Sequence, residues 1–111
     1  YISWSSENRS QLVRIPAAVG EYRRAEFRSP DPTSNPYLAF TLMIYAGLYG
    51  LENKLDLPNP ANINLFKASA ETLANLKKLP ENFSRACEIA AASDFIKEHI
   101  PAEILNIYCN R

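Results

Sequence analysis

The sequence predicts an α+β fold in which a short antiparallel β-hairpin is followed by a mainly helical tail. Residues 11–16 are rich in β-branched side chains and residues 22–28 alternate, with only residues 17–21 between them. From residue 36 onward, helix-start signals and helical spacing of apolar side chains replace this pattern. We therefore expect a strand and hairpin segment over residues 1–35 and a helical segment over residues 36–111.

The second predicted strand gathers charge on one face. Period-two alternation places four of its side chains on the same side: Tyr22, Arg24, Glu26 and Arg28. A turn centred near Val19 would set Arg14 directly opposite Arg24. Because like charges that face each other across a strand pair are destabilising, this register requires an anion between the two guanidinium groups.

The first helix is predicted to begin at Asn35-Pro36, which supplies a capping side chain followed by proline at the first helical position. Residues 37–51 contain no charged side chain, and apolar side chains cover every side of the helix. We expect this helix to be buried all round, with Gly47 and Gly50 allowing close approach of neighbours. It is slightly short for a bilayer span, so we expect no membrane partner.

The tail contains further helix signals. Residues 57–64 are predicted to be an extended connection, and residues 69–78 are a helix candidate. Pro80-Glu81 opens a second helix with a stripe of three side chains, Phe83, Cys87 and Ala90, and Pro101 opens the last helix. Cys87 and Cys109 lack the spacing of a zinc site or a dense disulfide framework, so we expect free, partly buried thiols.

The charge distribution points to anion recognition. The 111 residues carry 12 basic and 12 acidic side chains, so no overall charge favours nucleic acid or an anionic membrane. Residues 1–31 nevertheless hold five basic side chains, all arginine, whereas lysine predominates in residues 52–111. Because the guanidinium fork matches carboxylate and phosphate oxygens two at a time, this lysine-free cluster indicates an anion site.

Three motifs within the arginine cluster carry a family resemblance. Asn8-Arg9-Ser10, Arg14-Ile15-Pro16 and the segment from Arg24 to Tyr37 closely resemble the signature near the carboxyl end of the glutamine synthetase catalytic domain. The resemblance is strongest over residues 4–54 and becomes a looser match of helical pattern to residue 111. It implies that residues 1–111 are a carboxyl-terminal portion of that domain, and therefore a piece of a longer enzyme.

The resemblance also implies an activity and a role for each motif residue. The enzyme would be an ATP-dependent ligase that joins glutamate and ammonia through γ-glutamyl phosphate, with Mg²⁺ or Mn²⁺ as its metal. By motif position, Arg9 would be catalytic and would reach both the transferred phosphoryl group and the substrate glutamate. Arg14 and Arg24 would contact the phosphates of ATP, Glu26 would bind the metal, and Arg28 would hold a carboxylate of glutamate.

The residues leave other interpretations open. From spacing alone, arginines and glutamates that alternate on a strand are commonly a solvated face with weak ion pairs. Within the family, the acceptor could be an amine instead of ammonia, or the chain could be a non-catalytic assembly domain. The resemblance implies further partners, namely the rest of the catalytic domain and neighbouring subunits in a ring-shaped homo-oligomer, and a cytoplasmic location. Since further carboxylates and a metal-binding histidine are missing, we expect the chain alone to be inactive.

Overall fold

The computed structural model describes residues 1–110 and divides the chain into two compact units. One unit combines Tyr1–Asp31 with Leu57–Leu79, and the other combines Pro32–Asp56 with the segment that begins at Pro80. The first unit holds the strands and the second holds most of the helices. The predicted α+β class, with a small sheet followed mostly by helices, is therefore confirmed.

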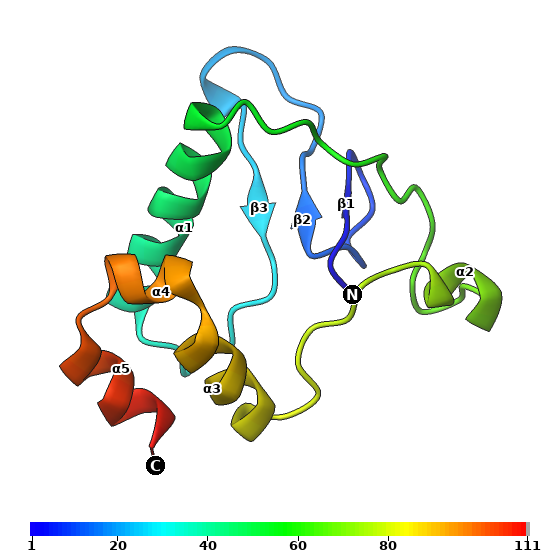
Figure 1. Ribbon diagram of the computed structural model, residues 1–111. Coiled ribbons are helices and arrows are strands. Elements are labelled where there is room, and N and C mark those ends of the chain that lie inside the picture. The colour runs from blue at the N-terminus through cyan, green and yellow to red at the C-terminus, as the bar shows by residue number, and fades with distance from the viewer. Residues whose placement is uncertain (111) are drawn as a thin grey trace. The chain divides into compact units, whose positions relative to one another are not determined.

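The sheet of the first unit has three very short strands in the order β1-β2-β3 (Figure 1). They are β1 (Trp4–Ser5), β2 (Val13–Arg14) and β3 (Glu26–Phe27). The antiparallel pairing of β2 with β3 confirms the predicted hairpin, although both strands are shorter than expected. The parallel pairing of β1 with β2 was not predicted, because two residues are too few to show a strand pattern.

The register of the hairpin differs from the prediction. Arg14 pairs with Glu26, so the expected pairing of Arg14 with Arg24 is wrong by two residues. The connection contains a short 3₁₀ helix, η1 (Gly20–Tyr22), and Gly20 has a φ of +59°. Only glycine adopts that conformation without steric cost, so the reversal centres on Gly20 instead of Val19. The observed register sets opposite charges against each other, which favours pairing.

Buried polar side chains hold the first unit together. Gln11 is 2% exposed, and its amide nitrogen donates to the carbonyl oxygen of Ile63 at 2.8 Å. Its amide oxygen accepts a hydrogen bond from the Ser3 hydroxyl. The backbone nitrogen of Ala61 donates to the oxygen of Trp4 at 2.8 Å, on the side of β1 away from β2. Residues 57–79 therefore cover the sheet edge that β1 would otherwise leave open.

Five α-helices follow the sheet in the described part of the chain (Figure 1). The first unit contains α2 (Ala70–Ala74), and the second contains α1 (Pro36–Glu52), α3 (Phe83–Ala92), α4 (Asp94–His99) and α5 (Ala102–Cys109). The helices predicted near residues 36, 69, 80 and 101 are thus confirmed. Helix α4 was not predicted as a separate element. Ser93 ends α3 in an extended conformation and caps α4 by accepting from the Ile96 nitrogen at 3.3 Å.

Asn35 begins α1 as predicted. Its side-chain oxygen accepts from the backbone nitrogens of Tyr37 at 3.0 Å and Leu38 at 3.4 Å, which satisfies two donors of the first turn. Its side-chain nitrogen donates to the Tyr108 hydroxyl of α5 at 2.7 Å. One side chain therefore both starts α1 and joins it to the last helix.

The predicted all-round burial of α1 is wrong for this chain. No residue of α1 is buried, and Tyr37 and Leu51 are 82% and 76% exposed. Within residues 1–110, nothing approaches within 4 Å of a Cβ built on Gly47 or Gly50. One side of α1 is covered by α4, where the Tyr45 and His99 rings stack with centroids 4.0 Å apart. In the part of the chain that the structure describes, no helix has the length and apolar character needed to cross a bilayer.

We predict that Asn35→Ala lowers the free energy of unfolding by about 1–2 kcal/mol, because it removes both the cap of α1 and the hydrogen bond to Tyr108. Asn35→Asp retains the capping oxygen and should lose less than half of that amount. Urea denaturation measures both changes. Asn59→Ala is the matched control, since Asn59 is exposed. Equal stability of the Asn35→Ala and Asn59→Ala variants would contradict the assigned cap.

Candidate functional site

Three arginine side chains converge on the carboxylate of Glu26. Arg14 Nη1 lies 3.1 Å from Oε1 and 3.0 Å from Oε2, so one nitrogen donates to both carboxylate oxygens. Arg24 donates to Oε1 from Nε at 3.3 Å and from Nη2 at 3.1 Å. Arg28 Nη1 donates to Oε2 at 3.5 Å. The Glu26 carboxylate is thus the anion that Arg14 and Arg24 share, although Arg14 pairs across the strands with Glu26 itself and not, as predicted, with Arg24.

Backbone and side-chain contacts fix Arg14 in place on β2. Its Nε donates to the carbonyl oxygen of Glu7 at 2.9 Å, and its Nη2 lies 3.9 Å from Glu7 Oε2. Glu7 Oε1 also accepts from the backbone nitrogen of Ala17 at 2.9 Å. Sequence reasoning missed Glu7, because only the folded chain shows that it holds both Arg14 and the start of the hairpin connection.

Arg24 and Arg28 flank Glu26 at spacings of two residues along the chain. This spacing puts all three side chains on one face, as the alternation predicted. Arg23 lies next to Arg24 but is exposed and forms no ion pair within residues 1–110. Arg24, and not Arg23, therefore lies on the face that contacts Glu26. Arg23 can serve as a control residue for Arg24.

Arg9 lies in the tight loop between β1 and β2. Asn8 Oδ1 accepts from the Ser10 backbone nitrogen at 2.9 Å and from the Ser10 hydroxyl at 2.8 Å. The Ser10 hydroxyl oxygen in turn accepts from the Leu65 backbone nitrogen at 3.0 Å, which ties the loop to the distant segment. The carbonyl oxygen of Arg9 accepts from Arg28 Nε at 3.0 Å. The loop is thus held on both sides of Arg9.

The Arg9 side chain itself is exposed, and within residues 1–110 it forms no ion pair or side-chain hydrogen bond. The Arg9 backbone contacts Arg28, which joins this residue to the three arginines around Glu26. We call Arg9, Arg14, Arg24, Glu26 and Arg28 the arginine cluster. Three of its arginines donate to the Glu26 carboxylate, the fourth is Arg9, and Glu7 lies beside Arg14. The cluster therefore has positive charge to spare and is suited to an anion.

The electrostatics of Glu26 follow from its neighbours. The hydrogen bond from Arg14 is the main cause that holds the pKa of Glu26 below its ordinary value. Partial burial opposes this effect, and the Arg24 guanidinium reinforces it. The Arg14 side chain is 12% exposed and that of Glu26 is 24% exposed, so the pair is better shielded than Arg24, which is 55% exposed.

Among residues 1–110, no three or more side chains of histidine, cysteine, aspartate or glutamate gather where they could hold a metal ion. Glu26 offers two oxygens that already accept hydrogen bonds from arginines. Since a hard divalent cation takes several oxygen ligands, these residues do not make up a complete metal site. The described residues fit anionic phosphate or carboxylate groups much better.

We predict that the pKa of Glu26 lies below its ordinary value of about 4.3 and rises when Arg14 is replaced by lysine, which cannot reproduce the guanidinium contacts. Because the folded-state pKa is the lower one, the stabilisation is complete above about pH 4.3 and is lost as pH falls through the folded-state pKa. Carbon-13 NMR of the Glu26 carboxyl measures the pKa. A midpoint above 4.3, or one that Arg14→Lys leaves unchanged, would overturn the assignment.

Comparison with known proteins identifies the family. Residues 1–111 match the family described as "Glutamine synthetase, catalytic domain". The chain is 44% identical over 110 residues to the glutamine synthetase of Methanosarcina mazei, which covers 97% of this chain and 25% of that protein. It is 39% identical over 109 residues, or 96% of the chain, to the glutamine synthetase of Methanocaldococcus jannaschii. It is 38% identical over 112 aligned residues, covering 99% of the chain, to the glutamine synthetase of Staphylococcus epidermidis.

These relatives are much longer than the chain, which spans about a quarter of the length of each one. The match nevertheless includes every residue of the arginine cluster and both compact units. The family resemblance inferred from the three arginine motifs is thereby confirmed. This chain belongs to the glutamine synthetase family, and it corresponds to part of that family's catalytic domain.

Proposed function

We propose that this chain is the carboxyl-terminal part of the catalytic domain of an ATP-dependent ligase that forms glutamine from glutamate and ammonia. The observation that carries the proposal is the arginine cluster, in which three arginines donate to Glu26 and one of them, Arg28, also binds the backbone of Arg9. The names of the relatives support this reaction over other uses of an anion site. Since the chain spans about a quarter of their length, the remaining parts of the site would come from the rest of the enzyme.

The proposed reaction explains why several arginines are needed together. ATP would transfer its γ-phosphoryl group to the γ-carboxylate of glutamate, and ammonia would then displace phosphate from γ-glutamyl phosphate to give glutamine. In the first step two anions, a nucleotide phosphate and a carboxylate, must approach each other. Phosphoryl transfer depends mainly on positioning and on neutralising this charge, which is what fixed guanidinium groups supply.

Each arginine has guanidinium N–H groups without a hydrogen-bond partner among residues 1–110, and its proposed role depends on them. Arg9, whose guanidinium group forms no ion pair within residues 1–110, would reach the transferred phosphoryl group and the glutamate. Arg24 and Arg14 would face the ATP phosphates. Within residues 1–110, Arg14 Nη2 forms only its 3.9 Å ion pair with Glu7, so this nitrogen retains donors for a phosphate while Nη1 stays on Glu26. Arg28 is 38% exposed and would hold a carboxylate of glutamate.

Glu26 is proposed as one oxygen ligand for Mg²⁺ or Mn²⁺. A bound divalent cation would neutralise phosphate charge, but residues 1–110 supply no complete set of ligands for it. In the chain as described, Glu26 instead orders the arginines by accepting from three of them. This ordering role needs no metal and keeps the guanidinium groups pointing to one place.

The proposed partners are the rest of the catalytic domain and neighbouring subunits in a ring-shaped homo-oligomer, with a cytoplasmic location. The exposed apolar surface supports further protein partners. The chain has 8848 Å² of accessible surface. Two separate globular units of half its mass would together expose only about 7,400 Å². The exposed residues include large apolar side chains of α1, which favour contact with other protein surfaces.

In the complete enzyme, we predict that Arg9→Lys lowers kcat by about 100-fold or more, because a transition-state contact is lost. Arg28→Lys should instead raise the KM for glutamate by about tenfold, because lysine cannot bind a carboxylate through two parallel hydrogen bonds. Arg23→Lys is the matched control and should leave both constants within about twofold, since Arg23 has no assigned contact. Steady-state assays of ATP-dependent glutamine formation measure all three.

The same assays can reject the proposal or refine it. Wild-type-like activity of the Arg9→Lys and Arg28→Lys variants would contradict the assigned roles. Faster turnover with an amine than with ammonia would show that the acceptor is an amine and that the enzyme is a glutamate–amine ligase. Full binding of ATP and glutamate without product from either acceptor would favour a non-catalytic member of the family.

We further predict that the purified 111-residue chain alone forms no glutamine from ATP, glutamate and ammonia. It supplies one carboxylate of the proposed metal site and only part of the groups that surround the substrates. Coupled measurement of phosphate release and glutamine formation checks this expectation, with the complete enzyme as the positive control. Robust glutamine formation by the chain alone would show that its own residues suffice.

A further inference from the structure

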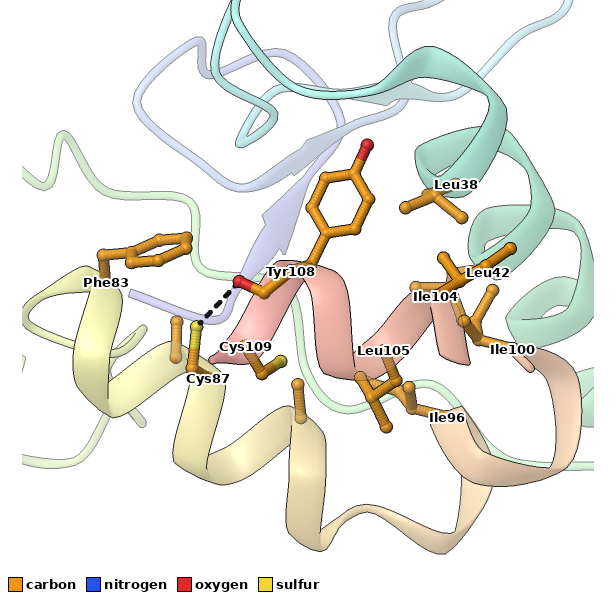
Figure 2. A pocket seen from close by; sticks show the side chains of 12 residues that line it. Leu38, Leu42, Phe83, Cys87, Ile96, Ile100, Ile104, Leu105, Tyr108 and Cys109 are labelled. Carbon is orange, nitrogen blue, oxygen red and sulfur yellow. Dashed lines mark hydrogen bonds between the residues drawn. The ribbon is translucent and has the colours of Figure 1, made fainter. Parts of the chain in front are cut away.

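An apolar cavity of about 200 Å³ lies among the helices of the second unit (Figure 2). Its lining includes no charged residue and comes from several helices, with Leu38 and Leu42 from α1, Ile104 and Leu105 from α5, and Ile96 from α4. Next to these helices, Ile100 is 5% exposed and is the most buried apolar residue described in this unit. The cavity is therefore part of the packing that joins the helices.

Two cysteines lie together at the wall of this cavity where α3 packs against α5 (Figure 2). Cys87 and Cys109 are both free and half-buried. The Cys87 thiol donates to the carbonyl oxygen of Tyr108 at 3.7 Å, and Tyr108 directly precedes Cys109. The contact holds the Cys87 sulfur close to the backbone that carries the second thiol.

The same cysteines also line a second, more polar pocket of about 240 Å³ with Ser84, Glu88 and Asn110. The thiols thus lie between an apolar interior and a polar opening, through which a small polar reagent can reach them. The ligase function assigns no role to either cysteine, and neither belongs to the arginine cluster.

We propose that Cys87 and Cys109 form a dithiol site that reacts with low-molecular-weight disulfides and closes to an intramolecular disulfide between α3 and α5. One cysteine thiolate attacks a sulfur of the reagent, so that its S–S bond breaks and a mixed disulfide forms with release of one thiol. The second cysteine thiolate then attacks the protein sulfur of the mixed disulfide and releases the other thiol. The two cysteines are oxidised, the reagent is reduced, and the two cysteine protons end on the released thiols.

The surroundings of Cys109 favour thiols on Cys87 and Cys109 that stay reduced until a disulfide reagent is supplied. Burial, reinforced by the neighbouring Cys87 thiol, raises the pKa of Cys109. Because the thiolate is the reactive form, Cys109 should resist indiscriminate oxidation at neutral pH. Once Cys87 carries the mixed disulfide, the target sulfur is held beside Cys109, and the high local concentration favours closure.

The test uses the 111-residue chain, reduced and then incubated with oxidised glutathione. Intact mass spectrometry under non-reducing conditions should show a monomer that has lost the mass of two hydrogen atoms and retains no glutathione. Peptide mapping should join the peptides that contain Cys87 and Cys109. The variant Cys109→Ser should retain one glutathione, because it has no second thiol for closure, and Cys87→Ser should take up glutathione more slowly, because it keeps only Cys109, whose pKa is raised.

A second comparison needs no variant. It tests whether the two cysteines react because the fold holds them close together or because they meet at random in an unfolded chain. Closure should be at least about tenfold more efficient in native buffer than in concentrated guanidinium chloride, because folding raises the local concentration of the second thiol. Equal closure in the two solvents would overturn the proposal. So would a native chain whose stable product carries two glutathiones, or one that forms mainly disulfide-linked dimers.

Discussion

The sharing of one carboxylate by three guanidinium groups is the constraint on which the site depends. Glu26 receives hydrogen bonds from Arg14, Arg24 and Arg28, although these residues come from two strands and the segments beside them. Without an anion, the cations on this face would repel one another and oppose pairing of β2 with β3. The ion pairs therefore favour the observed register of the hairpin and orient Arg14, Arg24 and Arg28 toward the same carboxylate.

Buried polar contacts extend this order to the loop that carries Arg9. Asn8 and Ser10 fix that loop internally, and Ser10 and Gln11 tie it to residues 63–65, more than fifty positions along the chain. The Arg28 side chain then binds the Arg9 backbone. As a result the loop that carries the exposed Arg9 is attached both to the arginines around Glu26 and to residues 63–65, and such support favours positioned anion recognition.

Sequence patterns succeeded where structure is decided locally. Asn35 caps α1, and Phe83 and Cys87 share a helix stripe, because capping and helical spacing depend on residues within four positions. The register, β1 and the role of Glu7 depend on contacts between separate segments, so no local pattern revealed them. The arginine motifs identified the candidate site residues, but the sequence did not show that Arg14 is held by Glu7 or that the Arg9 guanidinium remains unpaired among the described residues.

We propose above all that the arginine cluster serves phosphoryl transfer from ATP to glutamate. Positional isotope exchange in the complete enzyme tests this step without ammonia, by following oxygen-18 from the β,γ-bridge of ATP into the non-bridging β positions. We predict exchange that requires glutamate, persists in the Arg23→Lys variant and is lost in Arg9→Lys. Absence of glutamate-dependent exchange in a wild-type enzyme that binds both substrates, or undiminished exchange in Arg9→Lys, would contradict it.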